Sequence, residues 1–223
     1  MDNNINPNLI HALSILMILT SFAAVEARNL RHATLAYCVQ ALLICGLLAA
    51  YSVQNETLIY WAATALVTKA ILVPMFLWRS TAGVEQETRP LIGFGISTVI
   101  IGAVLWVMYR LTHMHAGLFI TTSDTTLAAI ADTNLAVAFT VFILGIYAIF
   151  TRRDAIKTVI GLCLLENGVH LSLVSLAPMI RETALVGIAT EVVITVYLLL
   201  YIIGGIKEKF GTTDTFKLSE LHW

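Results

Sequence analysis

Residues 127–150 read LAAIADTNLAVAFTVFILGIYAIF, an apolar run in which Asp132 is the one charged side chain. A helix needs about 20 predominantly apolar residues to cross the roughly 30 Å hydrocarbon core of a bilayer, so the run is long enough to span a membrane. It lacks the alternation of polar and apolar residues that marks a strand of a membrane barrel. We therefore predict a transmembrane helix here.

Six further runs of similar character lie on either side of this one. They cover about 8–25, 33–52, 58–78, 91–110, 155–178 and 183–205. The chain is 58% hydrophobic and 12% charged, whereas soluble proteins carry roughly 25% charged residues. This composition excludes a nucleic-acid-binding protein, a secreted disulfide scaffold and a disordered tail. We predict an all-α, polytopic transmembrane protein of about seven helices, with its first run retained rather than cleaved as a signal peptide.

The basic residues predict the orientation of these helices. If the helices alternate in direction, Arg110 and Arg181 fall on one side of the membrane and Lys69 lies within a helix. The other ten basic residues fall on the opposite side: Arg28, Arg31, Arg79, Arg89, Arg152, Arg153, Lys157, Lys207, Lys209 and Lys217. Because Lys and Arg are enriched in cytoplasmic loops, we predict an outer N-terminus and an inner C-terminus.

The segments between the predicted helices are too short to fold as soluble domains. No G-x-G-x-x-G, Walker A, C-x-x-C or H-E-x-x-H motif occurs, so we expect neither a cofactor nor a metal site. Cys38, Cys45 and Cys163 all lie within apolar runs and indicate no disulfide framework. The chain is expected to act inside the bilayer or through its partners.

Five ionisable residues within the predicted helices are candidates for moving ions: Lys69, Asp132, Glu166, His170 and Glu191. Each costs roughly 2.5–3.5 kcal/mol to insert if it is charged, so each needs a partner, a water-filled cavity or a function. Asp132 lies near a helix end, where a structural role is the simpler interpretation, although it could extend a proton path outward.

Glu166 lies at the centre of its predicted helix, and His170 follows one turn later on the same face. Glu191, on the next helix, is about 12 Å from the outer end at 1.5 Å per residue, which matches the depth of His170. The short connection predicts that the two helices are antiparallel neighbours. An imidazole between two carboxylates can accept a proton from one side and donate one to the other, so we predict a proton relay.

Lys69 lies at the centre of the third predicted helix, about one turn before Pro74. Pro74 frees a backbone carbonyl that could accept a hydrogen bond from the ammonium or from water. The alternative is a structural ion pair between Lys69 and Glu166 that moves no protons. Three tryptophans near helix ends are expected to be interfacial anchors: Trp61, Trp78 and Trp106.

The stretch 152–171, RRDAIKTVIGLCLLENGVHL, resembles a known family. Its part GLCLLENGVHL is similar to the GxCLxENGxHL signature of hydrogenase-4 component E, a membrane subunit of formate hydrogenlyase and related nickel–iron hydrogenases. Three further stretches fit that family, namely TKAILVP at 68–74, GIATE at 187–191, and GTTD at 211–214 with Leu218. The same region also resembles the RRN…IGxxxxxN stretch of the NuoK-type subunit of respiratory complex I.

The resemblance implies a cofactor-free subunit of a complex I-related hydrogenase in the cytoplasmic membrane of a bacterium or archaeon. The implied partners are antiporter-like (NuoL/M/N-type) and NuoH-type membrane subunits and a peripheral nickel–iron hydrogenase arm, with no catalysis by this chain alone. The resemblance also divides the chain. Residues 1–126 form an N-terminal four-helix part, and residues 127–223 form a NuoK-like three-helix module with a cytoplasmic tail.

In NuoK-type modules, two glutamates belong to a hydrophilic axis that couples redox chemistry to proton or sodium movement. Glu191 matches the glutamate of the third helix, whereas the glutamate of the second helix aligns with Cys163. The carboxylate stands three residues later here, at Glu166, on roughly the same helix face. Two alternatives remain open. One is a subunit of a free-standing Mrp-type cation/proton antiporter, and the other is a helical spacer between larger subunits.

Overall fold

The computed structural model of the chain describes residues 7–53, 56–83, 90–119, 125–176 and 182–219. Apart from one isolated β-bridge, the regular secondary structure of these ranges is helical, which confirms the predicted all-α fold. Seven of its helical segments are long and apolar enough to cross a membrane, so the chain is a multi-pass membrane protein.

The first three membrane spans comprise α1 (Pro7–Glu26), α2 (Leu30–Tyr51), and a composite of α3 (Thr57–Ala65), the π-helix η1 (Leu66–Leu72) and α4 (Val73–Ser80). The other four are α5 (Phe94–Phe119), α6 (Thr125–Thr151), α7 (Ala155–Leu176) and α8 (Glu182–Phe210), followed by the short α9 (Thr215–Ser219). The predicted spans agree closely with the structure except the fourth, since α5 extends past a kink at His115.

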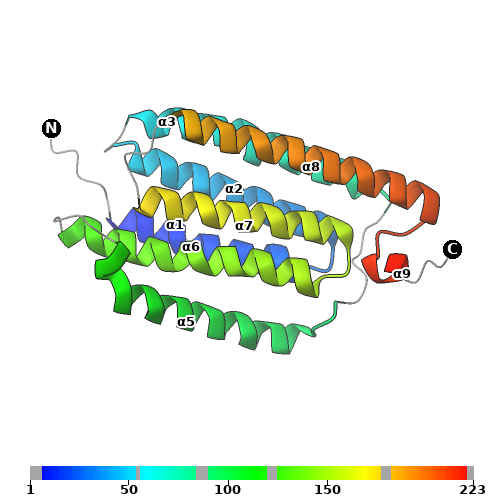
Figure 1. Cartoon of the computed structure of the whole chain (residues 1–223), viewed down its shortest axis with the longest axis horizontal. Coiled ribbons are helices and arrows are strands. Elements are labelled where there is room, and N and C mark those ends of the chain that lie inside the picture. Colours follow the sequence, from blue (N-terminus) through cyan, green and yellow to red (C-terminus); the bar gives the residue numbers. More distant parts are fainter. Residues whose placement is uncertain (1–6, 54–55, 84–89, 120–124, 177–181, 220–223) are drawn as a thin grey trace.

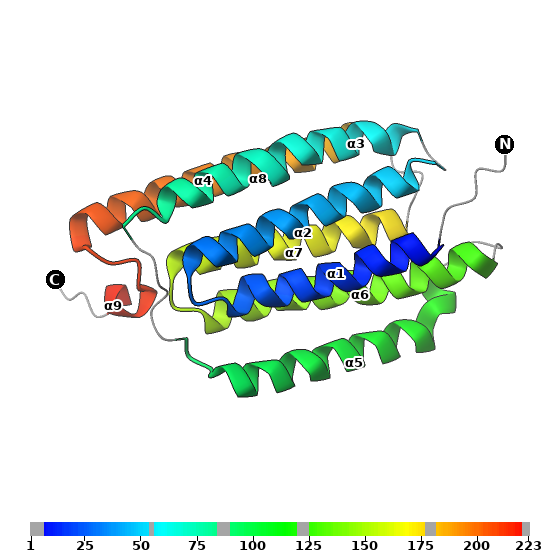
Figure 2. The same cartoon turned by 180° about the vertical axis from the view of Figure 1, so that it is seen from behind.

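The spans alternate in direction and lie along a common axis (Figure 1). The helices α6 and α7 form the closest pair, and α1 and α2 pack beside them. The composite third span and α8 lie together on one side of the molecule, and α5 lies on the other side against α6 (Figure 2). The predicted contact between α7 and α8 is present, but α8 also packs along the whole third span.

Two glycines let α6 and α7 approach until their backbones touch. A Cβ atom added to Gly145 of α6 would lie 2.4 Å from the backbone nitrogen of Leu165, and one on Gly168 of α7 would lie 2.6 Å from that of Phe142. Small residues permit such close crossings between membrane helices. This contact fixes the rotation of α7 and therefore the direction in which its polar side chains point.

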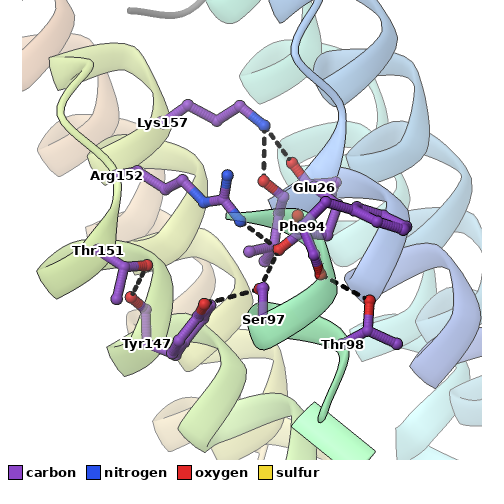
Figure 3. Close-up of polar contacts among 10 residues, drawn as sticks. Glu26, Phe94, Ser97, Thr98, Tyr147, Thr151, Arg152 and Lys157 are labelled. Atoms are coloured by element: carbon purple, nitrogen blue, oxygen red, sulfur yellow. Dashed lines mark hydrogen bonds and ion pairs between the residues drawn. The ribbon is translucent and has the colours of Figure 1, made fainter. Parts of the chain in front are cut away.

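Buried polar groups tie the helices together at one end of the bundle (Figure 3). The carboxylate of Glu26, the last residue of α1, accepts hydrogen bonds from the Arg152 guanidinium and the Ser97 hydroxyl. The Tyr147 hydroxyl of α6 donates to Ser97 Oγ at 2.6 Å. These contacts join α1, α5 and α6 at what we call the basic end of the bundle, where α1 ends and α2 begins.

Lys157 caps the C-terminus of α1 at the same end. Its ammonium donates to the backbone carbonyls of Ala24 at 2.8 Å and Val25 at 2.9 Å (Figure 3). A helix C-terminus leaves carbonyls without intrahelical partners and carries a partial negative charge, so a buried cation is stabilised there. Lys157 therefore has a structural role in joining α7 to the end of α1. It is also one of the basic residues that predict orientation.

The segment after α8 folds back onto the turn between α6 and α7. The N–H of Ala155 donates to the carbonyl of Thr213 at 3.0 Å, and Asp154 Oδ2 accepts from the Thr213 hydroxyl at 2.6 Å. Burial raises the pKa of the Asp154 carboxyl above its ordinary value, and the Thr213 hydroxyl and the Ile156 N–H oppose that rise. The bridge between Asp154 and Asp214 completes this contact, which fixes the C-terminal segment at the basic end.

Candidate functional site

The side chain of Lys69 lies in the centre of the bundle and is fully buried. Its ammonium contacts three acceptors, all on α7: Glu166 Oε1 at 3.0 Å, Asn167 Oδ1 at 2.8 Å and His170 Nδ1 at 2.5 Å. The contacts with Asn167 and His170 are hydrogen bonds, and the contact with Glu166 is an ion pair. The sequence predicted that Lys69 and Glu166 lie at similar depth, and in the structure they are in direct contact between the third and sixth spans.

Lys69 belongs to the π-helix η1, which interrupts the third span just before Pro74. A π-helical turn is rare and is often found at functional sites. Pro74 has no N–H, so it cannot donate a hydrogen bond to a carbonyl in the preceding turn. In that turn, the carbonyl of Ala70 accepts a hydrogen bond from the Cys38 thiol at 3.5 Å. Of the two partners predicted for a carbonyl freed by Pro74, ammonium or water, the ammonium is excluded, because side chains of α7 hold it.

His170 is buried between Lys69 and a tryptophan. Its Nδ1 faces the ammonium, so we assign the ring hydrogen to Nε2, which lies 3.5 Å from Glu166 Oε1. The indole of Trp61 meets the imidazole edge-on, with ring centroids 5.2 Å apart. Trp61 is 1% exposed, so the expectation that it anchors the helix at the membrane interface is wrong. It lies against the site because α3 brings it to the face of α7.

A second polar branch leaves the site through Asn167. The Asn167 amide donates to Gln40 Oε1 of α2 at 2.7 Å, and Gln40 Nε2 donates to Ser21 Oγ of α1 at 3.2 Å. All three side chains are completely buried. Sequence reasoning missed Gln40 and Ser21 because it examined ionisable residues alone. An amide within an otherwise apolar run was the available signal for Gln40.

Glu166 also borders a cavity of about 170 Å³ between α7 and α8. Glu191 of α8 lines the opposite side of this cavity, and Cys163 lines it one turn before Glu166. The side chain of Glu166 is 18% exposed, so the carboxylate reaches both the buried ammonium and the cavity. The structure therefore brings Lys69, Glu166 and His170 into contact and places Glu191 across the cavity from Glu166. His170 does not lie between the two carboxylates as predicted, because its ring packs against Lys69 and Trp61 and does not line the cavity.

Asp132 is not part of this group. Its Oδ2 lies 3.0 Å from His113 Nδ1 on α5, and α5 lies on the far side of α6 from η1 and α8 (Figures 1 and 2). Asp132 thus has a partner of its own at the end of the bundle opposite the basic end. Among the residues that the structure describes, no three His, Cys, Asp or Glu side chains could together hold a metal ion.

Comparisons with known proteins agree with the motifs of the sequence. The family NADH-ubiquinone/plastoquinone oxidoreductase chain 4L matches residues 133–223. Hydrogenase-4 component E of Escherichia coli (strain K12) is 28% identical over 215 residues, which cover 96% of this chain and 97% of that protein. This chain is similar to hydrogenase-4 component E over almost the whole length of both proteins. Component E of Shigella flexneri is equally similar, and an uncharacterized protein of Mycobacterium tuberculosis is 24% identical over 92% of each chain. No solved structure matches the chain.

The resemblance to component E and to the NuoK-type subunit, stated from the motifs, is confirmed by these matches. The chain 4L match contains the α7 acceptors and Glu191. Lys69 and Gln40 lie outside that match and within the longer similarity to component E. The site is therefore built from both parts of the chain, since the part without chain 4L similarity supplies the ammonium.

Proposed function

We propose that the chain is a cofactor-free membrane subunit of a complex I-related, membrane-bound hydrogenase complex, and that it takes part in proton or sodium translocation. The similarity to component E over almost the whole of both chains supports this role. The proposed partners are antiporter-like and NuoH-type membrane subunits and a peripheral nickel–iron hydrogenase arm. The subunit resides in the cytoplasmic membrane of a prokaryote, with its basic end and C-terminus on the cytoplasmic side.

One observation carries the translocation proposal: a buried ammonium and a second carboxylate are both within reach of Glu166. Lys69 holds Glu166 from one side, and Glu191 faces it across the cavity. A cavity of about 170 Å³ far exceeds the roughly 15 Å³ that holds one water molecule by the same measure, so water fits in the cavity that the two carboxylates line. A proton can then pass between Glu191 and Glu166 through water inside the membrane.

Protonation of Glu166 would change the electrostatic environment of the Lys69 ammonium. It removes the negative charge that faces the ammonium, while Asn167 and the neutral His170 keep their hydrogen bonds to Lys69 Nζ. The His170 Nε2–H lies toward the same carboxylate and is the second donor available to it. A purely structural ion pair would need one cation and one carboxylate. The additional His170 and Glu191 therefore favour a relay over a helical spacer.

The test replaces Glu166 and Glu191 by glutamine, one at a time, in the complete complex. We expect both variants to assemble and to oxidise hydrogen with an artificial dye, but to lose most of their ion pumping in inverted membrane vesicles. Glu208→Gln is the matched control, because Glu208 is an exposed glutamate near the basic end of α8. Normal pumping in both variants would refute the relay.

The hydrogenase assignment has its own test. Purification of the chain with its natural partners should yield nickel together with iron–sulfur absorbance. A complex that contains neither, but still exchanges cations for protons in vesicles, would instead favour a free-standing antiporter of the Mrp type.

A further inference from the structure

Helix α5 is tied to its neighbours at both ends and stands apart from α1 in the middle. At the basic end, the rings of Phe22 and Phe94 meet edge-on with centroids 6.1 Å apart, and Ser97 donates to Glu26. At the other end, His113 pairs with Asp132 of α6. Between these contacts α5 packs on α6, while a groove separates it from α1.

This groove is apolar and measures about 480 Å³, within the roughly 300–1,000 Å³ typical of ligand pockets. Its walls include Ile15 and Leu19 of α1, Gly102 and Trp106 of α5, and Val137 of α6. A Cβ atom added to Gly102 would meet no other group within 4 Å, so the missing side chain helps to make the space. Trp106 is 66% exposed, so the groove opens toward the membrane. An empty apolar groove would forfeit dispersion contacts along its lining.

The depth of the groove favours a lipid tail over a helix as its occupant. Along α5 the groove extends from Gly102 to Tyr109, about 10 Å at 1.5 Å per residue. It begins about 12 Å from Phe94 by the same rise, close to the middle of the roughly 30 Å core, and runs from there toward the end opposite the basic end. A helix of another subunit would cross both halves and meet the closed contact of Phe22 and Phe94. An acyl chain that enters from the opposite leaflet ends near the midplane.

A cation stands where the headgroup of such a lipid would lie. Arg110 follows Trp106 by one turn, is exposed, and pairs with none of the residues that the structure describes. The neighbouring Tyr109 lines the groove, and its ring stacks on that of His113 with centroids 6.0 Å apart. Guanidinium groups bind phosphate oxygens through charge-assisted hydrogen bonds.

We propose that this groove binds a phospholipid, with one acyl chain between α1, α5 and α6 and the phosphate at Arg110. The site is distinct from the Lys69 site, because α6 separates the two sides of the bundle (Figure 1). The bound acyl chain would pack against the middle turns of α5, which otherwise packs mainly on α6.

Photo-cross-linking of the complete complex in phosphatidylcholine nanodiscs tests this proposal. The probe is phosphatidylglycerol with a diazirine on its acyl chain, and a diacylglycerol with the same chain reports binding without a phosphate. We expect cross-links at 102–109 and 15–19, and we expect Gly102→Leu to reduce them about tenfold, which corresponds to a loss of about 1.4 kcal/mol. Gly95→Leu is the matched control, since a side chain at Gly95 also meets nothing within 4 Å but lies outside the groove.

Arg110→Gln tests the headgroup contact. It should lower labelling by the phosphatidylglycerol probe and leave labelling by diacylglycerol unchanged. Ile18→Phe fills the groove from α1 and should act like Gly102→Leu, which keeps the test valid if the leucine variant fails to assemble. Equal labelling in the groove-filling variants and Gly95→Leu would overturn the proposal. Cross-links from groove residues to a helix of another subunit would overturn it as well.

Discussion

The ammonium of Lys69 lies 3.0 Å from the carboxylate of Glu166, and this contact joins the part of the chain outside the chain 4L match to the part inside it. Lys69 is fully buried, whereas the Glu166 side chain is 18% exposed toward the cavity that it shares with Glu191. The ion pair is thus buried on the Lys69 side, at η1, and accessible from the cavity on the Glu166 side, next to α8. The proposed relay requires this asymmetry, since the carboxylate has to exchange a proton while the ammonium stays in place.

Lys69→Met and Glu166→Leu should each destabilise the chain strongly, whereas the double variant should not. Removal of one partner leaves a buried charge without compensation, which costs about 3–5 kcal/mol, while replacement of both by apolar residues is often nearly neutral. Unfolding of the purified chain in mixed micelles measures the free energies for a double-mutant cycle. The double variant should also lose ion pumping.

Lys209→Met is the control for that cycle, because Lys209 is an exposed cation near the end of α8 and should change stability by less than about 0.5 kcal/mol. If the effects of the two substitutions simply add, the ion pair does not hold the helices together. Full pumping in the double variant would support the helical spacer instead.

The amide of Asn167 should matter for stability even though it carries no charge. It accepts a hydrogen bond from Lys69 and donates one to Gln40. Asn167→Leu therefore leaves the buried amide oxygen of Gln40 and one hydrogen of the Lys69 ammonium without partners. We expect a cost of about 1–3 kcal/mol. Asn167→Leu combined with Gln40→Leu should cost less than the sum of the two single changes. The second substitution removes the Gln40 amide that the first leaves without its hydrogen-bond donor.

Ser172→Ala provides a matched control on the same helix, since within the described part of the chain the Ser172 hydroxyl donates to the Val169 carbonyl of its own helix. The same unfolding assay should show a smaller effect there. Strict additivity of Asn167→Leu and Gln40→Leu would mean that the branch toward α1 contributes no coupled interaction.

Depth along the membrane normal was predictable from the sequence, whereas the direction in which each side chain points was not. Counting residues from the helix ends placed Lys69 and Glu166 near the midplane, and the structure joins them. The same counting could not show that Asp132 faces α5, because depth says nothing of rotation about the helix axis. The rotation of α7 depends on its backbone contact with α6 at Gly145 and Gly168.

The π-helix η1 and the position of Trp61 were unpredictable for a related reason. Mean hydropathy and length are the same for a π-turn and an α-turn, so the third span read as one continuous helix. Trp61 lies near a helix end, where tryptophan usually anchors at the interface, yet α3 and α7 pack so closely that its ring meets His170. Contacts between distant segments decide both features.

The contact of the C-terminal segment with the α6–α7 turn should weaken as the pH rises. Burial raises the pKa of Asp154 above its ordinary value of 3.8, so the folded contact binds the proton more tightly than the released segment does. Stability therefore falls between pH 3.8 and the raised pKa and is constant above it. Hydrogen exchange of residues 211–219 measures this loss of protection.

Asp154→Asn should remove that pH dependence, since the amide oxygen can still accept from the Ile156 N–H and the side chain no longer ionises. Thr213→Val provides the complementary change, because it deletes the hydroxyl that donates to Asp154 and should weaken the contact at every pH. Protection of 211–219 that rises with pH in the unchanged protein would contradict the prediction.

Gly168→Ala should destabilise the chain although alanine is the better helix former. The added methyl would lie 2.6 Å from the Phe142 nitrogen and 2.8 Å from the Ala138 carbonyl oxygen, and backbone atoms cannot move aside as a flexible side chain can. Overpacking of this kind costs about 1–3 kcal/mol and should push α7 away from α6. Because α7 carries all three acceptors of Lys69, ion pumping should fall together with stability.

Gly204→Ala supplies the opposite expectation within the same chain. Gly204 lies inside α8, and an added Cβ atom there meets nothing within 4 Å. The gain in helix propensity, up to about 1 kcal/mol, is then unopposed, so unfolding in mixed micelles should show a neutral or stabilising change. If both substitutions shift stability in the same direction, the close contact at Gly168 does not control the position of α7, and the Lys69 site must be held by its polar contacts alone.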